Sequence, residues 1–218
     1  MSYKVILVGG SGLIGSCLLS ELRSSDEISD ILLVARSASG ISDPKIRELI
    51  LNFDDLDSHA EELKADIIFS CLGTTTGKTP DANLYRKIDL EYPLKMLHIG
   101  MNKGLKQFHI VTSIGADAAS SNSYLKLKGE LENSLKSSGV PSLHIYQPSF
   151  LKGERREKRP AEIIMNILSV IIDPLLIGPL KKYKSIKAKT VAKTMLKQSL
   201  KDLKGTFIYP SIQIQNLS

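Results

Sequence analysis

A glycine-rich segment near the start of the chain constrains the fold more than any other feature. Residues 9–15 read GGSGLIG, directly after the apolar run KVILV at 4–8 and at the start of an apolar helical pattern at 13–24. The glycines fit two spacings, G-x-G-x-x-G from Gly10 and G-x-x-G-x-x-G from Gly9. A strand, a glycine turn and a helix in this order predict the first unit of a parallel α/β sheet.

Short apolar runs alternate with helical patterns along the rest of the chain, as in strands covered on both faces. We expect one α/β domain over residues 1–218, with a doubly wound, mostly parallel sheet, helices on both faces, and a small substrate-side extension at 151–218. The expected strands are 4–8, 31–35, 49–53, 66–72, 107–113, 142–147 and 206–209. The expected helices are 13–24, 84–103, 122–138, 161–172 and 187–202, with a loop at 36–48 and a linker at 173–186.

Glycines in the first turn allow positive φ and let the backbone approach a pyrophosphate. The pyrophosphate would rest on backbone N–H groups at the helix N-terminus. We therefore expect a dinucleotide at this turn, and a structural turn without ligand is the alternative. The expected contacts are Gly9, Ser11, Gly12, Leu13, Ile14 and Gly15.

Arg36 bears on the choice of cofactor. It follows the second expected strand, about 20 residues beyond the turn, where an NAD-binding fold has an acidic residue. A guanidinium can instead bind a 2′-phosphate through two parallel hydrogen bonds. The sequence therefore favours NADP(H) over NAD(H), with a surface arginine as the alternative.

Two more strand ends offer contacts to the adenosine half of such a cofactor. Asp54 follows the third strand and would accept a hydrogen bond from the adenine amino group, or else cap the next helix. Leu72 and Gly73 lie in CLGTT after the fourth strand and would contact the ribose, because Gly73 permits a close approach.

A candidate catalytic group follows the fifth strand. Tyr124 and Lys128 are four residues apart at the start of an expected helix, so both side chains lie on one face. A lysine ammonium favours the phenolate form of a nearby tyrosine, which suits acid–base chemistry near neutral pH. We expect Tyr124 and Lys128 to contact the cofactor as well, with Lys128 holding its nicotinamide ribose. Ser113 lies at the carboxyl edge of the sheet, where open α/β sheets bind ligands, and would orient a substrate carbonyl.

Other chemistries lack their motifs. The four histidines fall on separate elements without H-E-x-x-H or Cys/His spacing, so we expect no metal site. There is no G-x-S-x-G for a hydrolase. The two cysteines, Cys17 and Cys71, indicate a reducing compartment, and the N-terminus shows no export signal, so we expect a cytoplasmic protein.

The net charge of +6 is spread unevenly. Residues 1–150 hold 15 basic and 18 acidic residues, whereas residues 151–218 hold 14 and 5. A basic end can face nucleic acid or an acidic membrane. Lysines that recur without interleaved aromatics favour a solvated helix face, so we expect no nucleic-acid partner.

Residues 163–180 read IIMNILSVIIDPLLIGPL and are almost apolar enough for a membrane span. Asp173 beside Pro174, followed by Pro179, would leave a charge and unpaired backbone groups in hydrocarbon. We therefore expect no integral membrane segment. A core helix or the wall of a substrate pocket is the first interpretation, and contact with a protein partner or a second copy is the other.

Five segments together resemble the atypical short-chain dehydrogenases/reductases, in particular the group of the Tat-interactive oxidoreductase. They are the glycine turn, CLGTT at 71–75, SIGAD at 113–117, SSNSYLKLKGELE at 120–132 and QPSFLKGERREKRP at 147–160. The resemblance implies an NADP-binding Rossmann fold with Ser113, Tyr124 and Lys128 at the catalytic positions. It further implies cofactor contacts from Leu151 and Arg159. The chain departs from the family at Ser37, where a second arginine is usual, and at Gln147 and Ser149, where the family has R-P-G.

The expected function is that of an NADP-dependent oxidoreductase acting on a small carbonyl or alcohol substrate. One alternative is an NADPH-binding regulatory or assembly protein that docks a partner through 163–180. A sugar-nucleotide epimerase is the third hypothesis, although it usually needs a larger C-terminal substrate domain than 151–218.

Overall fold

The computed structural model describes residues 2–75, 77–153, 176 and 178–218. Its centre is a seven-stranded sheet in the order β3-β2-β1-β4-β5-β6-β9, and every neighbouring pair is parallel. The strands are β1 (Tyr3–Val8), β2 (Ile28–Ala35), β3 (Ile46–Ile50), β4 (Ile67–Ser70), β5 (Gln107–Val111), β6 (Ser142–Gln147) and β9 (Gly205–Pro210). The doubly wound parallel sheet expected from the sequence is confirmed.

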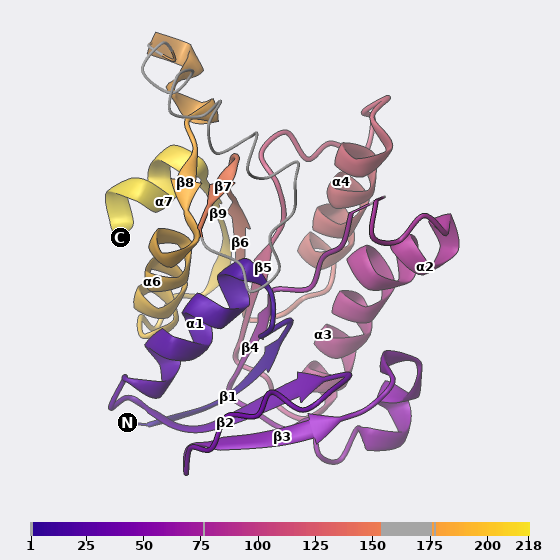
Figure 1. The fold of residues 1–218 in the computed structure, drawn as a ribbon, viewed down its shortest axis with the longest axis vertical. Helices are drawn as coiled ribbons and strands as arrows, with labels where there is room; N and C mark the ends of the chain where they lie inside the picture. The colour runs from indigo at the N-terminus through magenta and orange to yellow at the C-terminus, as the bar shows by residue number, and fades with distance from the viewer. Residues whose placement is uncertain (1, 76, 154–175, 177) are drawn as a thin grey trace.

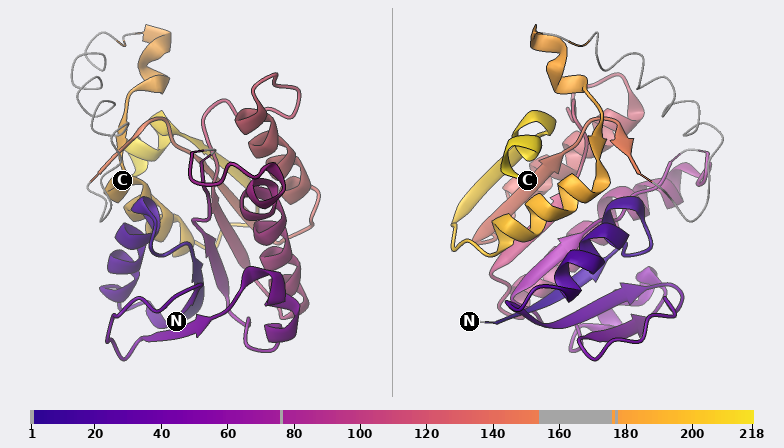
Figure 2. Two further views of the ribbon diagram at one scale, coloured as in Figure 1. Left: turned by 45° about the vertical axis from the view of Figure 1, so that its right-hand side comes forward. Right: turned by 60° about the vertical axis from the view of Figure 1, so that its left-hand side comes forward.

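Helices cover both faces of this sheet (Figure 1 and Figure 2). One face carries α1 (Leu13–Arg23), α6 (Ala188–Ser199) and α7 (Ser211–Leu217). The other face carries α2 (Ala82–Arg86), α3 (Tyr92–Asn102) and α4 (Ser123–Lys136). Alternation along each strand divides the core between them: Ile6 and Val8 pack toward α2–α4, whereas Val5 and Leu7 pack toward α1 and α6.

Two elements differ from the sequence-based expectation in the first half of the chain. The expected strand at 49–53 begins earlier, at Ile46 inside the loop expected at 36–48. It ends at Ile50, because the Asn52 side chain caps a 3₁₀ helix, η1 (Phe53–His59). The expected helix at 84–103 is divided into α2, a π-helical segment η2 (Lys87–Glu91) and α3.

The C-terminal part differs more. The linker expected at 173–186 contains a 3₁₀ helix, η4 (Gly178–Tyr183), and α7 follows β9 where no helix was expected. A second, two-stranded sheet joins β7 (Leu151–Lys152) to β8 (Ile186–Lys187). The helix expected at 161–172 lies outside the described residues. Because β9 extends the main sheet, part of the range 151–218 belongs to the central fold; a substrate-side role for this range stays a prediction.

Candidate cofactor and active site

The glycine turn joins β1 to α1 where backbones cross too closely for side chains. Gly9 has φ +79°, and an ideal Cβ on it would lie 2.5 Å from the Cys71 carbonyl oxygen. A Cβ on Gly15 would overlap the Gly9 carbonyl oxygen, which accepts the N–H of Gly12 at 3.0 Å. The glycines of the G-x-x-G-x-x-G spacing therefore form one compact turn.

Gly12 differs from these two glycines because the surrounding protein leaves more room for a Cβ atom at this position. Its φ is −73°, and an ideal Cβ would lie 3.2 Å from the Gly9 oxygen. Gly12 is the N-cap of α1, no side chain among the described residues caps this helix, and its first turn has no acidic residue. By contrast, the side chains of Asp81 and Asn122 cap α2 and α4. The open N–H groups of α1 and the cradle at Gly12 fit a pyrophosphate.

The predicted contacts Ser11, Leu13 and Ile14 lie in this turn and in the first turn of α1, where Ser11 is exposed. Arg36 lies one residue beyond the end of β2, and its side chain is also exposed. Arg36 has no ion pair with any residue that the structure describes, so its guanidinium is available to an external anion.

Asp54 is held by cations and a hydroxyl. Its Oδ1 accepts hydrogen bonds from Lys87 Nζ and from the Tyr92 hydroxyl, both at 2.9 Å. The Lys87 hydrogen bond is the largest cause that lowers the pKa of Asp54, and the Tyr92 hydrogen bond adds to it. Asn52, and not Asp54, caps η1, so the capping alternative for Asp54 is wrong. Its contact with adenine stays a prediction.

Tyr124 and Lys128 lie one turn apart on α4, with Tyr124 half-buried and Lys128 buried. The residue after Lys128 is a glycine, Gly129, because a loop backbone crosses α4 at this point. A Cβ on Gly129 would overlap the Ala118 backbone nitrogen. The loop that begins with Ser113 therefore packs directly on the helix that carries Tyr124 and Lys128.

A second contact holds the same loop. Asp117 N–H donates to the Leu125 carbonyl at 3.0 Å, beside the first turn of α4. Ser113 itself is half-buried after β5, and its hydroxyl donates to the Ile114 carbonyl at 3.3 Å. This weak local hydrogen bond is one that a substrate oxygen can replace.

Asp89 is the residue that the sequence analysis missed. Its Oδ1 lies 2.7 Å from Lys128 Nζ, and the two side chains are 1% and 4% exposed. Its Oδ2 accepts the backbone N–H of Thr74 at 2.8 Å. An ideal Cβ on Gly73 would lie 3.6 Å from Asp89 Oδ1 and 4.0 Å from Lys128 Nζ. Asp89 and Lys128 therefore lie beside the loop that is predicted to contact the adenosine ribose of the cofactor.

The sequence did carry a signal for Asp89. It occupies the i+4 position from Tyr85 and the i−3 position from Tyr92, both buried, so a carboxylate stands at a core position of the helix. Burial raises the pKa of Tyr85, and the charges of Asp89 and Tyr124 add to this rise. Tyr85, Asp89 and Tyr124 thus share one electrostatic environment.

Glu132 is a second buried carboxylate, one turn beyond Lys128 on α4. It accepts hydrogen bonds from Thr112 Oγ1 at 2.7 Å and from Gln147 Nε2 at 2.9 Å. Thr112 follows β5 and Gln147 ends β6, so Glu132 ties two strand ends to the helix. Gln147, one of the departures from the family pattern, therefore joins the end of β6 to α4 through Glu132.

Two histidines expected on separate elements lie together on neighbouring strands. The rings of His109 and His144 stack with centroids 4.1 Å apart and planes 7° apart. His109 Nδ1 lies 3.1 Å from the Tyr146 hydroxyl, and His144 Nδ1 lies 2.9 Å from the Tyr209 hydroxyl. No cluster of three metal-ligating side chains occurs among the residues described.

The segment after β6 runs beside the glycine turn. Leu151 begins β7 and is half-buried, and an ideal Cβ on Gly153 would lie 2.8 Å from Leu13 Cδ1. Arg159, the other contact implied by the resemblance, lies outside the described residues. So do 163–175 and 177, which make up most of the segment proposed for a partner.

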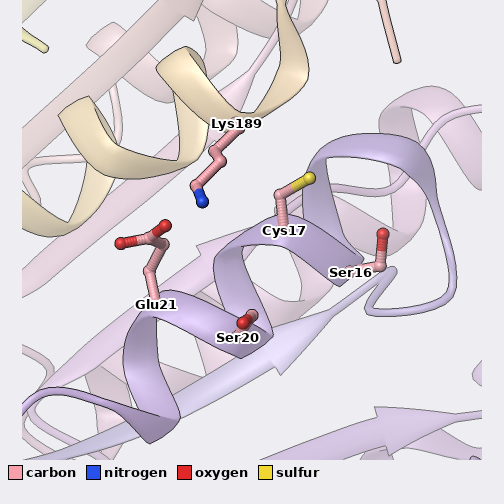
Figure 3. A pocket seen from close by; sticks show the side chains of 5 residues that line it. All are labelled: Ser16, Cys17, Ser20, Glu21 and Lys189. Atoms are coloured by element: carbon pink, nitrogen blue, oxygen red, sulfur yellow. The ribbon is translucent and has the colours of Figure 1, made fainter. Parts of the chain in front are cut away.

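A small cavity of about 220 Å³ lies on the seam between α1 and α6 (Figure 3). Cys17, Glu21 and Lys189 line it together with Ser16 and Ser20. Burial raises the pKa of the Cys17 thiol, while the charge of Lys189 lowers it by less. The catalytic candidates do not line this cavity.

Comparison with known proteins identifies relatives along most of the chain, although no family model matches it. The chain is 32% identical to protein HTATIP2 of Rattus norvegicus over 163 residues, which cover 73% of this chain and 67% of the relative. It is 30% identical to protein FMP52, mitochondrial, of Coccidioides immitis over 215 residues, which cover 92% and 87%. Its identity to protein fmp52 of Aspergillus niger is 29% over 209 residues, which cover 93% and 89%.

Solved structures share the fold at lower identity. The UDP-N-acetylglucosamine 4-epimerase of Methanobrevibacter ruminantium M1 superposes with a TM-score of 0.72 at 18% identity, covering 96% of this chain and 76% of that chain. The Bordetella bronchiseptica enzyme WbmH, solved in complex with NAD⁺, has a TM-score of 0.72 at 16% identity, with the same coverage. The fold of this chain is therefore one that holds a nicotinamide dinucleotide in other proteins.

The relatives correct one expectation. Several fungal relatives are named mitochondrial proteins, which contradicts the cytoplasmic location expected from the sequence. Unpaired cysteines indicate a reducing environment and do not distinguish the cytosol from other reducing compartments. No helix in the described part of the chain is long and apolar enough to cross a membrane. With the glycine turn, the parallel sheet and these relatives in agreement, the chain belongs to the atypical short-chain dehydrogenase/reductase family, in the group that includes HTATIP2 and FMP52.

Proposed function

We propose that this chain is an NADP-dependent oxidoreductase that reduces a small carbonyl compound or oxidises the corresponding alcohol. The observation that carries the proposal is the buried ammonium of Lys128, held by Asp89 one helical turn after Tyr124. A buried pair of charges is costly, and this one lies at the carboxyl edge of a parallel sheet, where α/β folds bind ligands, which supports a part in the reaction.

Each residue has a distinct part in this proposal. Ser113 donates a hydrogen bond to the substrate carbonyl and orients it. Tyr124 donates the proton that converts the developing alkoxide to the alcohol. Lys128 stabilises the phenolate that remains on Tyr124, and Asp89 fixes the Lys128 side chain. When bound, NADPH supplies the hydride to the carbonyl carbon.

The cofactor would lie along the carboxyl edge of the sheet. The N–H groups from Gly12 to Ile14 would hold the pyrophosphate, and Leu72 and Gly73 would contact the ribose. Arg36 is free to bind a 2′-phosphate, and Ser37 beside it offers a hydroxyl where other family members have a second arginine.

Cofactor choice is tested by calorimetric titration of the wild type and Arg36→Ala with NADPH and NADH. One charge-assisted contact gives about a tenfold to hundredfold preference for NADPH, and Arg36→Ala should lose it while NADH affinity stays constant. Lys64→Ala removes an exposed cation elsewhere and is the matched control. Equal affinities of the wild type for both cofactors would contradict the proposal.

The alternatives predict other behaviour. An NADPH-binding regulatory protein would bind the cofactor but show no turnover with any carbonyl substrate. Two solved epimerases share the fold at 18% and 13% identity, which supports no transfer of their sugar-nucleotide substrates to this chain.

A further inference from the structure

The C-terminal part of the chain carries a long basic stretch that the proposed reaction does not use. Residues 174–201 contain eight lysines and no aspartate, glutamate or arginine. The lysines are Lys181, Lys182, Lys184, Lys187, Lys189, Lys193, Lys197 and Lys201. The stretch runs through η4, β8 and α6 without a compensating negative charge of its own.

These lysines face solvent. Seven of the eight are exposed and Lys184 is half-buried, and none of them has an ion pair with a residue in the described ranges. On α6 the exposed positions Lys189, Lys193 and Lys197 recur every four residues, so they form one stripe along the helix. None of the eight is therefore held in an ion pair within the described protein, although Lys189 lines a cavity together with Glu21.

Apolar side chains accompany the lysines at η4. Leu180 is 51% exposed and Tyr183 is 39% exposed, between and beside Lys181, Lys182 and Lys184. Lys182 Nζ lies 5.1 Å from the centre of the Tyr183 ring. We call residues 180–184 the η4 tip. In both figures η4 stands out beyond the ends of α4 and α6 (Figure 1 and Figure 2).

Phe150 adds a third exposed apolar side chain close to this region. It is 58% exposed, and its carbonyl accepts the N–H of Ile186, which follows the η4 tip. Large apolar side chains that project from a monomer together with uncompensated charge mark an interaction surface. A ligand for this surface needs negative charge and an apolar layer.

From these features we infer that the η4 tip binds the surface of an anionic membrane. Lysines near an anionic leaflet are attracted by its surface potential, and tyrosine and leucine side chains enter the boundary between headgroups and acyl chains. The stripe on α6 adds attraction at longer range within the Debye length. This surface would hold the chain on a bilayer through contacts with headgroups and the outer part of the acyl chains.

Nucleic acid fits this surface less well. Nucleic-acid surfaces typically use arginine forks on phosphates and stack bases on aromatic rings. The basic stretch has no arginine, and the one aromatic ring at the η4 tip already lies beneath Lys182. Leucine at the tip contributes to a lipid interface and has no counterpart in phosphate binding.

The test is co-sedimentation of the full chain with vesicles of phosphatidylcholine alone and of phosphatidylcholine mixed with phosphatidylserine. The wild type should bind only the mixed vesicles, and binding should fall as salt is raised. Lys181→Gln/Lys182→Gln/Lys184→Gln should weaken the partition coefficient by about a hundredfold. Leu180→Ser/Tyr183→Ser keeps the charge and should weaken it by about tenfold.

Matched controls separate this surface from net charge and misfolding. Lys4→Gln/Lys64→Gln/Lys126→Gln removes three exposed lysines elsewhere and should leave vesicle binding within about twofold. Thermal unfolding of all variants should match the wild type. Equal weakening by the control variant, or equal binding to phosphatidylcholine alone, would overturn the inference. So would an RNA oligonucleotide that binds through the same lysines while mixed vesicles do not bind.

Discussion

Two buried polar clusters lie on opposite faces of the same sheet and differ in charge and in whether their polar groups are open to a ligand. On the face of α2–α4, Asp89 and Lys128 form a charged pair at the carboxyl edge, beside Gly73. On the face of α1 and α6, His109 and His144 form a stacked pair inside the sheet, each with hydrogen bonds on both ring nitrogens.

In the histidine cluster, formed around His109 and His144, the ring nitrogens all have hydrogen-bond partners within the protein. Gln107 Nε2 donates to the Ser199 carbonyl at 3.1 Å, so its Oε1 accepts from His109 Nε2 at 2.9 Å and His109 Nδ1 accepts from Tyr146. Burial lowers the pKa of His109 well below its usual range, and the neighbouring His144 adds to this. A neutral network with every group paired fixes the packing of β5, β6 and β9 and leaves nothing for a ligand.

The pair of Asp89 and Lys128 is charged and lies at the carboxyl edge of the sheet. From this difference we expect two roles. A neutral network in the middle of a sheet, with every hydrogen bond made, stabilises the fold, whereas a charged pair at the carboxyl edge takes part in the reaction. Paired substitutions in the two clusters test this distinction.

Turnover should change more than any other property. Tyr124→Phe keeps the ring but removes the transferable proton, so kcat should fall by about 10²–10⁴-fold with NADPH affinity nearly unchanged. Tyr146→Phe removes a hydroxyl of equal chemistry from the histidine cluster and should leave kcat unchanged. Stopped-flow NADPH oxidation across a panel of aldehydes, ketones and quinones measures both. Turnover that survives Tyr124→Phe, or that falls equally in Tyr146→Phe, would remove the distinction.

The next effect is on stability. Lys128→Met leaves the Asp89 carboxylate buried with the Thr74 N–H as its remaining hydrogen bond, and should destabilise the protein by about 3–5 kcal/mol in urea unfolding. The double variant Asp89→Asn/Lys128→Met removes both charges and should recover most of this loss. Lys126→Met, on an exposed position of the same helix, should change stability by less than about 0.5 kcal/mol. A double variant no more stable than Lys128→Met would show that the pair is not coupled.

These two clusters also show what the sequence could predict. The spacing of Tyr124 and Lys128 on one helix face, and the strand–turn–helix at GGSGLIG, depend on residues close in sequence. The contact of Asp89 with Lys128 joins two helices, and the stack of His109 on His144 depends on strand order and register, so neither followed from local patterns. The helix α7 is only seven residues long, with an I-Q-I alternation typical of a strand, and its position depends on the burial of Ile214.

A third prediction concerns pH. Burial lowers the pKa of His144 to about 4, whereas an unfolded histidine titrates near 6.5. The unfolded chain therefore binds more protons between these values, and stability falls as pH falls from about 6.5 toward 4. His144 alone should cost about 2 kcal/mol at pH 5 relative to pH 7, and His109 acts in the same direction. Urea unfolding at both pH values measures the loss. Equal stability at pH 5 and pH 7 would show that the histidines are not held neutral.

The smallest effect is that of a single hydroxyl in the closed network. Tyr209→Phe keeps the ring that stacks on Tyr146 at 4.9 Å but leaves His144 Nδ1 without its donor at 2.9 Å. One neutral hydrogen bond contributes about 1 kcal/mol, so the unfolding free energy should fall by about this amount while vesicle binding and NADPH affinity stay constant. Tyr183→Phe removes a hydroxyl from an exposed ring and is the control, with no measurable loss of stability expected. A loss of NADPH affinity in Tyr209→Phe would connect the histidine cluster to the cofactor edge, and the division between a structural and a chemical cluster would then fail.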